Sequence, residues 1–163
     1  MPWLRDGSIG RNIRVTDLHM PTLRQARDGD WKSIGQLLQE SGLPTADLGP
    51  DKLDGFLGVE VGDELAGLIG LQVYGTTGLL RSLVVAKQVR SAGFGGKLVG
   101  ALESAAQTAG IRELWLLTID AERFFEQQGF TIVNRETVPD VIRETDEFSD
   151  LCPGDAFLMM KKL

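Results

Sequence analysis

The stretch from Leu79 to Leu98 constrains this chain more than any other part of the sequence. An apolar run ends at Val85, a polar loop with three glycines follows, and apolar residues then recur at helical spacing. A strand that enters a glycine-rich turn and then a helix leaves backbone N–H groups unpaired, and the helix dipole adds positive potential there. The stretch therefore predicts an anion-binding site between a strand and a helix.

The loop has the pattern Arg90-x-x-Gly93-x-Gly95. Glycine lets backbone amides approach an anion without a Cβ in the way, and Arg90 adds positive charge. The Gly-Lys-Ser/Thr ending of a nucleoside-triphosphate loop is absent. Three antiparallel-looking strands precede the loop, which a dinucleotide-binding unit does not have. The alternative is a flexible loop that only leads into a helix.

Bulk properties exclude several classes of function. A length of 163 residues favours one domain with its own hydrophobic core. The net charge of −6 argues against a nucleic-acid partner. No apolar run is long enough for a membrane span, and no signal peptide is visible. The single cysteine, Cys152, excludes an internal disulfide and fits a reducing cytosol, so we expect a cytoplasmic protein.

The only histidine, His19, precedes Met20 in a segment without clear periodicity. We interpret residues 1–19 as a leader or extension and residues 20–163 as the folded domain. A domain without histidine excludes Ser-His-Asp hydrolysis, Cys-His proteolysis and ordinary zinc sites, so no metal is expected.

The spacing of apolar residues predicts a single α+β domain around a mixed, mostly antiparallel sheet. Gly62-Asp63 between two apolar runs is typical of a hairpin. The strand that follows the helix after the glycine loop is expected to lie parallel to the strand before it. Strands are expected at 21–26, 56–61, 64–74, 79–86, 112–119, 130–135 and 155–161. Helices are expected at 31–41, 94–109, 120–128 and 139–143.

Two motifs resemble the GCN5-related N-acetyltransferases, the GNAT family. Residues 83–95, with Arg90-x-x-Gly93-x-Gly95 after a strand, look like the family's acetyl-CoA loop. Residues 121–130, Ala-Glu-Arg-Phe-Phe-Glu-Gln-Gln-Gly-Phe, resemble its Ala-x-x-Phe-Tyr-x-x-x-Gly-Phe helix and turn. The motifs lie in the family's order and at about its usual spacing, and the resemblance covers Met20–Leu163.

The resemblance implies a GNAT fold with flanking helices, in which strands 79–86 and 112–119 splay apart around acetyl-CoA. Backbone groups of Val84 and Val85 would pair with the pantetheine arm like an added strand, and the loop amides would hold the pyrophosphate. The expected cofactor-binding residues are Leu83, Val84, Val85, Arg90, Ser91, Ala92, Gly93, Phe94, Gly95, Gly96, Lys97 and Phe125.

One departure from the family concerns the general acid. The family often has a tyrosine at the position of Phe125, where the phenol protonates the departing thiolate of CoA. Phe125 has no O–H group. Water, Ser82, Thr118 or Cys152 would then supply the proton, or the thiolate leaves unassisted, which a thiol pKa near ~8.5 tolerates.

The acceptor amine must be neutral to attack, so the site needs a base or a path to water. Glu60 lies in an apolar strand and is a candidate base, with a solvent-facing strand position as the alternative. Asp120 and Glu122 stand at a helix start, where N-capping and compensation of the helix dipole are the default roles. The catalytic candidates are Glu60, Ser82 and Thr118.

Arg81 interrupts an apolar strand, and a buried arginine needs an anionic partner. It either holds a substrate carboxylate in bidentate fashion or forms an internal salt bridge, and the sequence leaves both open. Arg143 and Tyr74 are the other candidate substrate-binding residues.

Within the family, the chain resembles the arsenic-resistance branch most closely. The similar segments are 44–48, 79–85, 116–118, 124–125 and 142–153. The Leu-Leu-Thr strand, the Phe-Phe helix and the Cys-Pro tail are also similar to the acetyltransferase domain that makes N-acetylglutamate. A Cys-Pro turn is the expected role of Cys152, since one thiol is a poor arsenite site.

These resemblances imply direct acetyl transfer from acetyl-CoA to the amine of a small amino-acid-like acceptor. A link to arsenic resistance is an association of that branch. The alternatives are a glutamate or amino-acid N-acetyltransferase of arginine synthesis and a non-catalytic module that senses acetyl-CoA. A homodimer is common on this fold and stays open.

Overall fold

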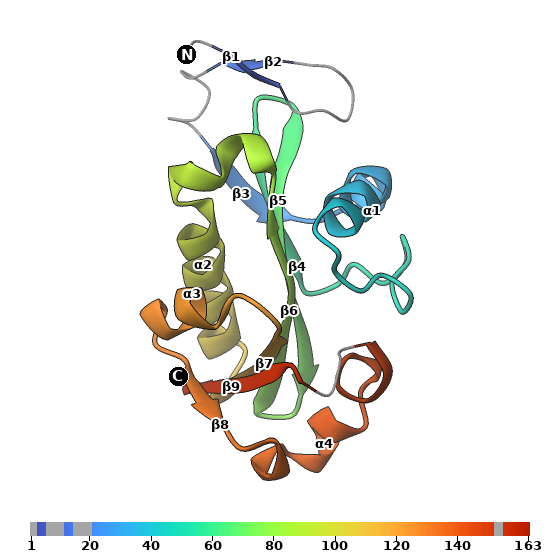
Figure 1. Ribbon diagram of the computed structural model, residues 1–163. Coiled ribbons are helices and arrows are strands. Elements are labelled where there is room, and N and C mark those ends of the chain that lie inside the picture. Colours follow the sequence, from blue (N-terminus) through green and yellow to red (C-terminus); the bar gives the residue numbers. More distant parts are fainter. Residues whose placement is uncertain (1–2, 6–11, 15–20, 152–154) are drawn as a thin grey trace. The chain divides into compact units, whose positions relative to one another are not determined.

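The computed structural model describes residues 3–5, 12–14, 21–151 and 155–163 (Figure 1). The strands are β1 (Trp3–Arg5), β2 (Asn12–Arg14), β3 (Thr22–Gln25), β4 (Phe56–Val61), β5 (Glu64–Tyr74), β6 (Thr77–Val85), β7 (Glu113–Thr118), β8 (Thr131–Val133) and β9 (Phe157–Lys162). The α-helices are α1 (Trp31–Glu40), α2 (Phe94–Thr108), α3 (Glu122–Gln127) and α4 (Asp140–Arg143). Shorter helical segments are η2 (Asp28–Asp30), η3 (Lys87–Ala92), η4 (Arg135–Thr137) and η5 (Glu147–Leu151).

The main sheet is mixed and mostly antiparallel, as the sequence predicts. Its strand order is β3-β4-β5-β6-β7-β9-β8, and β1 and β2 form a separate two-stranded sheet. The β3–β4, β4–β5, β7–β9 and β8–β9 ladders are antiparallel, whereas β6 and β7 are parallel. The chain forms two compact units, residues 1–70 with 82–102 and residues 71–81 with 103–163.

In the first unit, α1 and α2 lie on opposite sides of the strands (Figure 1). The buried side chains of α1 are Ile34, Leu37 and Leu38, the stripe that helical spacing predicts. Gly67 of β5 allows α2 to approach the sheet closely. A Cβ on Gly67 would lie 3.1 Å from Leu98 Cδ1 and 3.1 Å from the carbonyl oxygen of Val84. The glycine therefore fixes how the helix after the anion loop packs on the sheet.

Strand β6 is irregular at Ser82, whose φ is 59°. Among the described residues it is the only non-glycine residue with positive φ. Such a residue bends a strand and changes which face the following side chains occupy, as in a β-bulge. The irregularity separates Arg81, a candidate for the acceptor, from Leu83, a candidate for the cofactor.

In the second unit, β9 lies between β7 and β8 and is antiparallel to both. The parallel pairs of β6 and β7 join Thr77–Leu79 to Glu113–Trp115, as expected for a crossover through a helix. A cluster of buried side chains packs under these strands and connects α4 to the sheet. It contains Leu79, Trp115, Val138, Ile142 and Leu158.

The expected strands and main helices are all present, with small shifts at their ends. The short strands β1 and β2 and the short helical segments η2, η3, η4 and η5 were not predicted. Helical turns this short carry no repeated apolar stripe, so apolar spacing does not reveal them.

The interpretation of residues 1–19 as a leader or extension stays a prediction. His19 and Cys152 lie outside the residues that the structure describes. Within the part of the chain that the structure describes, no helix has the length and apolar character that crossing a membrane requires.

Candidate functional site

The predicted anion loop is a left-handed turn followed directly by a long helix. Gly93 ends η3 with φ 79° and ψ 15°, and α2 begins at the next residue. The amide of Lys97 donates to Gly93 O at 3.3 Å. The amides of Phe94, Gly95 and Gly96 belong to the first turn, where intrahelical acceptors are lacking. These N–H groups and the positive end of a 15-residue helix can bind an anion.

Arg90 connects this loop to two other segments of the first unit. Its Nε donates to Val85 O at 3.0 Å, and its Nη2 donates to Ser41 Oγ at 3.3 Å. The guanidinium therefore links the loop, the end of β6 and the residue that ends α1. Sequence reasoning assigned Arg90 a charge beside the loop but did not identify Ser41 as its partner.

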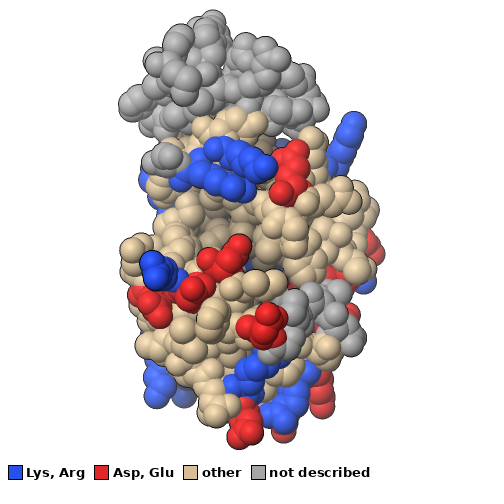
Figure 2. Space-filling view, viewed as in Figure 1, with Lys and Arg blue, Asp and Glu red and all other residues tan. Residues whose placement is uncertain are grey.

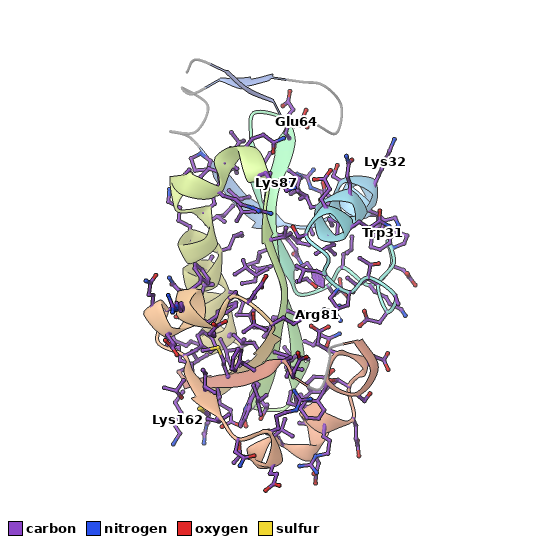
Figure 3. The ribbon with its side chains drawn as sticks, viewed as in Figure 1. Trp31, Lys32, Glu64, Arg81, Lys87 and Lys162 are labelled. Atoms are coloured by element: carbon purple, nitrogen blue, oxygen red, sulfur yellow. The ribbon has the colours of Figure 1, made fainter. Side chains whose placement is uncertain are left out.

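Positive charge gathers around the loop. Lys87, Arg90 and Lys97 are all exposed, and Figure 2 shows basic side chains over this part of the first unit, with Lys87 labelled in Figure 3. Lys97 Nζ lies 5.7 Å from the centre of the buried Phe94 ring, within cation–π range. Exposed cations next to free amides favour phosphate groups over neutral ligands.

The residues of β6 that precede the loop are packed against the sheet. Val84 is buried, whereas Leu83 and Val85 are half-buried. The amide of Ala86 donates to Ala66 O at 2.8 Å, which fixes the end of β6 against β5. All of the residues predicted for the cofactor except Phe125 thus lie between Leu83 and Lys97 in the first unit, whereas Phe125 belongs to the second.

Glu60 belongs to a network of charges on β3, η2 and β4. Arg24 Nε donates to Glu60 Oε2 at 2.7 Å, and the same guanidinium binds Asp30 through two nitrogens at 2.7 and 2.8 Å. The hydrogen bond from Arg24 lowers the pKa of Asp30, and the bond to Asp30 raises the pKa of Arg24. The Glu60 carboxylate is thus engaged with Arg24, as in a structural ion pair.

Arg81 is buried in the second unit and has an anionic partner. Its Nη2 lies 3.3 Å from Glu147 Oε2, and the two side chains are 0% and 6% exposed. Figure 3 shows the Arg81 side chain inside the molecule, close to the C-terminal helical segment. The internal salt bridge that sequence reasoning left open is therefore present, and Glu147 is a residue that reasoning missed.

Arg143 and Tyr74, the other acceptor candidates, differ in exposure. Arg143 is exposed at the end of α4, and its Nη2 lies 3.4 Å from Glu136 O and 3.5 Å from Val138 O. Tyr74 is half-buried against the Leu79 cluster, and its hydroxyl donates to Gln72 Oε1 at 3.4 Å. Arg143 therefore offers a cation to solvent, whereas Tyr74 contributes mainly to packing.

Thr118, at the end of β7, caps the turn before α3. Its Oγ1 accepts a hydrogen bond from the amide of Ala121 at 3.0 Å. The N-cap residue of α3 is Ala121, so N-capping by Asp120 is wrong. The amide of Ala121, at the start of α3, instead donates to the hydroxyl of Thr118, which lies two residues before Asp120. Glu122 does lie in the first turn, where its charge complements the helix dipole.

Phe125 is a core residue of the second unit. Its ring makes edge-on contacts with Phe124 and Phe130 at centroid distances of 5.1 and 5.6 Å. This packing explains why an aromatic ring without a hydroxyl is tolerated at this position. Among the residues the structure describes, no cluster of three or more His, Cys, Asp or Glu side chains is placed to hold a metal ion.

Comparison with known proteins identifies the family to which the chain is similar. The sequence pattern described as the acetyltransferase (GNAT) family matches residues 16–130. N-acetylglutamate synthase from Neisseria gonorrhoeae, solved with coenzyme A and N-acetyl-glutamate, gives a TM-score of 0.78 at 22% identity. The match covers 88% of this chain but only 35% of that one. No curated protein matches the chain.

Two further structures match over almost their whole length. Rv2747 from Mycobacterium tuberculosis, solved with CoA, has a TM-score of 0.74 at 22% identity over 87% of this chain and 99% of its own. The PaiA N-acetyltransferase from Thermoplasma acidophilum, solved with coenzyme A, has a TM-score of 0.68 at 17% identity over 88% and 99%. At these identities the likeness concerns the fold. Because the family pattern covers more than half of the chain, including the anion loop and α3, the chain belongs to the acetyltransferase (GNAT) family.

Proposed function

We propose that the chain is an acetyl-CoA-dependent N-acetyltransferase that acts on a small amino-acid-like acceptor with an anionic group. The observation that carries this proposal is the anion loop of the first unit. There a left-handed Gly93 precedes the first-turn amides of a 15-residue helix, in a chain of the GNAT family. Neighbours of the same fold were solved with coenzyme A, which agrees with this ligand.

The residues of the loop fit the chemical groups of acetyl-CoA. The amides from Gly93 to Gly96 would hold the pyrophosphate, and Lys97 adds a cation beside them. A Cβ on Gly93 would meet nothing within 4 Å, so the space beside this glycine is open to a ligand. Backbone groups of Val84 and Val85 would bind the pantetheine arm. When bound, acetyl-CoA supplies a thioester as the acetyl donor.

The arginines of the second unit support an anionic acceptor. Arg143 is exposed, whereas Arg81 is already paired with the Glu147 carboxylate. The synthase from Neisseria gonorrhoeae was solved with N-acetyl-glutamate, an acetylated amino acid. The resemblance to the arsenic-resistance branch adds amino acids with arsonate or phosphonate groups to the acceptors worth testing.

Acetyl transfer forms a C–N bond and breaks the C–S bond of the thioester. The attacking amine loses one proton, and CoA leaves as a thiolate, a fair leaving group at a thiol pKa near ~8.5. Glu60 is engaged with Arg24, and the Thr118 hydroxyl accepts from Ala121. We therefore assign removal of the amine proton to water, and Ser82 is the remaining hydroxyl to test as the proton donor to the departing thiolate.

The test is a screen of acceptors with the purified chain and acetyl-CoA. Release of free CoA thiol and the mass of the product are measured for amino acids and for their phosphonate and arsonate analogues. We expect turnover with acceptors that carry both an amine and an anionic group. Arg143→Gln should raise the acceptor KM at least fivefold without changing the KM for acetyl-CoA, whereas exposed Arg123→Gln should change neither.

Other outcomes of the screen identify the alternatives. Turnover with glutamate alone would favour an enzyme of arginine synthesis, which the likeness to N-acetylglutamate synthase also suggests. Tight binding of acetyl-CoA without turnover of any amine would favour the sensor and refute the proposed reaction.

A further inference from the structure

The carboxylate of Glu147 has no role in the function proposed above. It is one of the few buried charged groups among the described residues, together with Glu64 and Arg81. Its Oε2 lies 3.3 Å from Arg81 Nη2, and both residues belong to the second unit. Transfer of two charges from water is costly, so a buried pair of this kind calls for a reason beyond stability.

Burial of Arg81 restricts how an acceptor reaches it. The guanidinium side chain is 0% exposed, and a carboxylate already lies against one of its nitrogens. An anionic acceptor that binds Arg81 must therefore take the place of the Glu147 carboxylate. The same exchange keeps the buried arginine paired before and after binding, which avoids the large cost of an unpaired charge.

The segment that carries Glu147 has other anchors in the second unit. The Arg135 guanidinium lies 4.6 Å from the centre of the Phe148 ring. The amide of Phe148 donates to Thr145 Oγ1 at 3.2 Å, and Ser149 Oγ donates to Thr145 O at 2.9 Å. None of these contacts involves Arg81, so they hold η5 independently of the Arg81–Glu147 pair.

We propose that Glu147 is a specificity-determining residue whose carboxylate stands in for the acceptor's anionic group at Arg81. The proposal rests on the function proposed above. An acceptor with a carboxylate or similar anion replaces Glu147, whereas a neutral amine leaves the internal pair intact. Selectivity then arises because wrong acceptors must compete with a resident anion that they cannot match.

The test is the acceptor KM of Glu147→Gln. Glutamine keeps the size of the side chain but competes less strongly for a guanidinium. We expect the KM for an anionic acceptor to fall at least threefold, with the KM for acetyl-CoA unchanged. The same acceptor with its carboxylate converted to a carboxamide should gain nothing. Glu144→Gln, at an exposed position just after α4, should leave every KM unchanged.

A thermal measurement gives a second readout. Glu147→Gln should melt at a lower temperature than the wild type without acceptor, and an anionic acceptor should raise its Tm by more than it raises the wild-type Tm. In an Arg81→Gln background, Glu147→Gln should no longer lower the acceptor KM, because the exchange acts through Arg81. Glu147→Asp, which keeps the charge, should have a KM between those of the wild type and Glu147→Gln.

An acceptor KM that stays the same or rises in Glu147→Gln would overturn the proposal and leave Glu147 a structural residue. A wild-type chain that acetylates none of the acceptors would refute the proposed function, and the role of Glu147 with it. Acetyl transfer by the wild type with no effect of Glu147→Gln would refute the role of Glu147 alone.

Discussion

The two candidate binding regions are built in opposite ways. The anion loop of the first unit uses backbone amides of neighbouring residues, held by Gly93 and the start of α2. The Arg81–Glu147 pair of the second unit uses two side chains from distant positions, buried against each other. The first is specified by a local pattern of residue types, and the second by tertiary packing. A local substitution should therefore affect the loop alone, whereas removal of one member of the pair should affect the stability of the fold.

The substitution with the largest expected effect on stability is Glu147→Ala, which tests whether the buried pair holds the second unit together. It leaves the Arg81 guanidinium buried without this carboxylate, so we expect a loss of about 3 kcal/mol in the free energy of unfolding. Denaturant unfolding measures it. Glu144→Ala, at an exposed position, should change stability by no more than about 0.5 kcal/mol. Equal effects of the two substitutions would show that the buried pair does not hold the second unit together.

A second test concerns Ser82, whose backbone has a positive φ. A β-branched side chain is strongly disfavoured at the left-handed φ of 59°, so Ser82→Val should destabilise the chain by about 2 kcal/mol. Ser82→Gly, which suits that conformation, should lie within about 0.5 kcal/mol of the wild type. Thermal unfolding of the two variants decides the matter. A valine variant as stable as the glycine variant would mean that β6 is regular in solution.

The loop should respond in ligand binding as well as in stability, because a branched side chain is strained at the left-handed φ of Gly93. Gly93→Val places a branched side chain at φ 79°, in the open space where phosphates would approach. We expect the Kd for acetyl-CoA to rise at least tenfold, about 1.4 kcal/mol, as measured by calorimetry. Gly100→Val is the control, since a Cβ there also meets nothing within 4 Å but φ is not positive. Unchanged binding by Gly93→Val would place the cofactor elsewhere.

The smallest effect concerns the partly exposed charges of the first unit. Arg24 holds the pKa of Asp30 below its ordinary value, so this pair stabilises the fold at neutral pH. That stability is lost as the pH falls through the lowered pKa of Asp30. The unfolding free energy of the wild type should therefore fall more steeply than that of Asp30→Asn below about pH 4. Asp28→Asn, at an exposed neighbour, should follow the wild-type curve.

Much of the fold is predictable from the sequence because its signals are local. Apolar alternation and turn residues indicate the β4–β5 hairpin, and the helical stripe after Gly93 indicates α2. The parallel arrangement of β6 and β7 follows from the helix that connects them, since a crossover of this kind returns the chain to the same end of the sheet. The turn η5 and the left-handed Ser82 are not predictable in this way, because they depend on contacts rather than on residue type.

In the candidate site, too, the features that depend on neighbouring residues are predictable, and those that depend on distant contacts are not. The position of the loop is predictable, since Arg90, Gly93 and the helix start are adjacent in the sequence. The need of Arg81 for an anion is predictable as well, because a buried guanidinium requires one. The identity of Glu147 as partner is not, since several acidic residues lie in the same C-terminal stretch and nothing in their spacing separates them.

The place of β9 has a consequence for the order of assembly. Because β9 inserts between β7 and β8, β8 has no partner strand and β7 pairs only with β6 until residues 157–162 have been synthesised. Pairing of this kind joins distant parts of the chain and is slow to form. Until then β8 presents an unpaired edge that other chains can bind. Chaperone dependence is therefore expected to concentrate on the second unit.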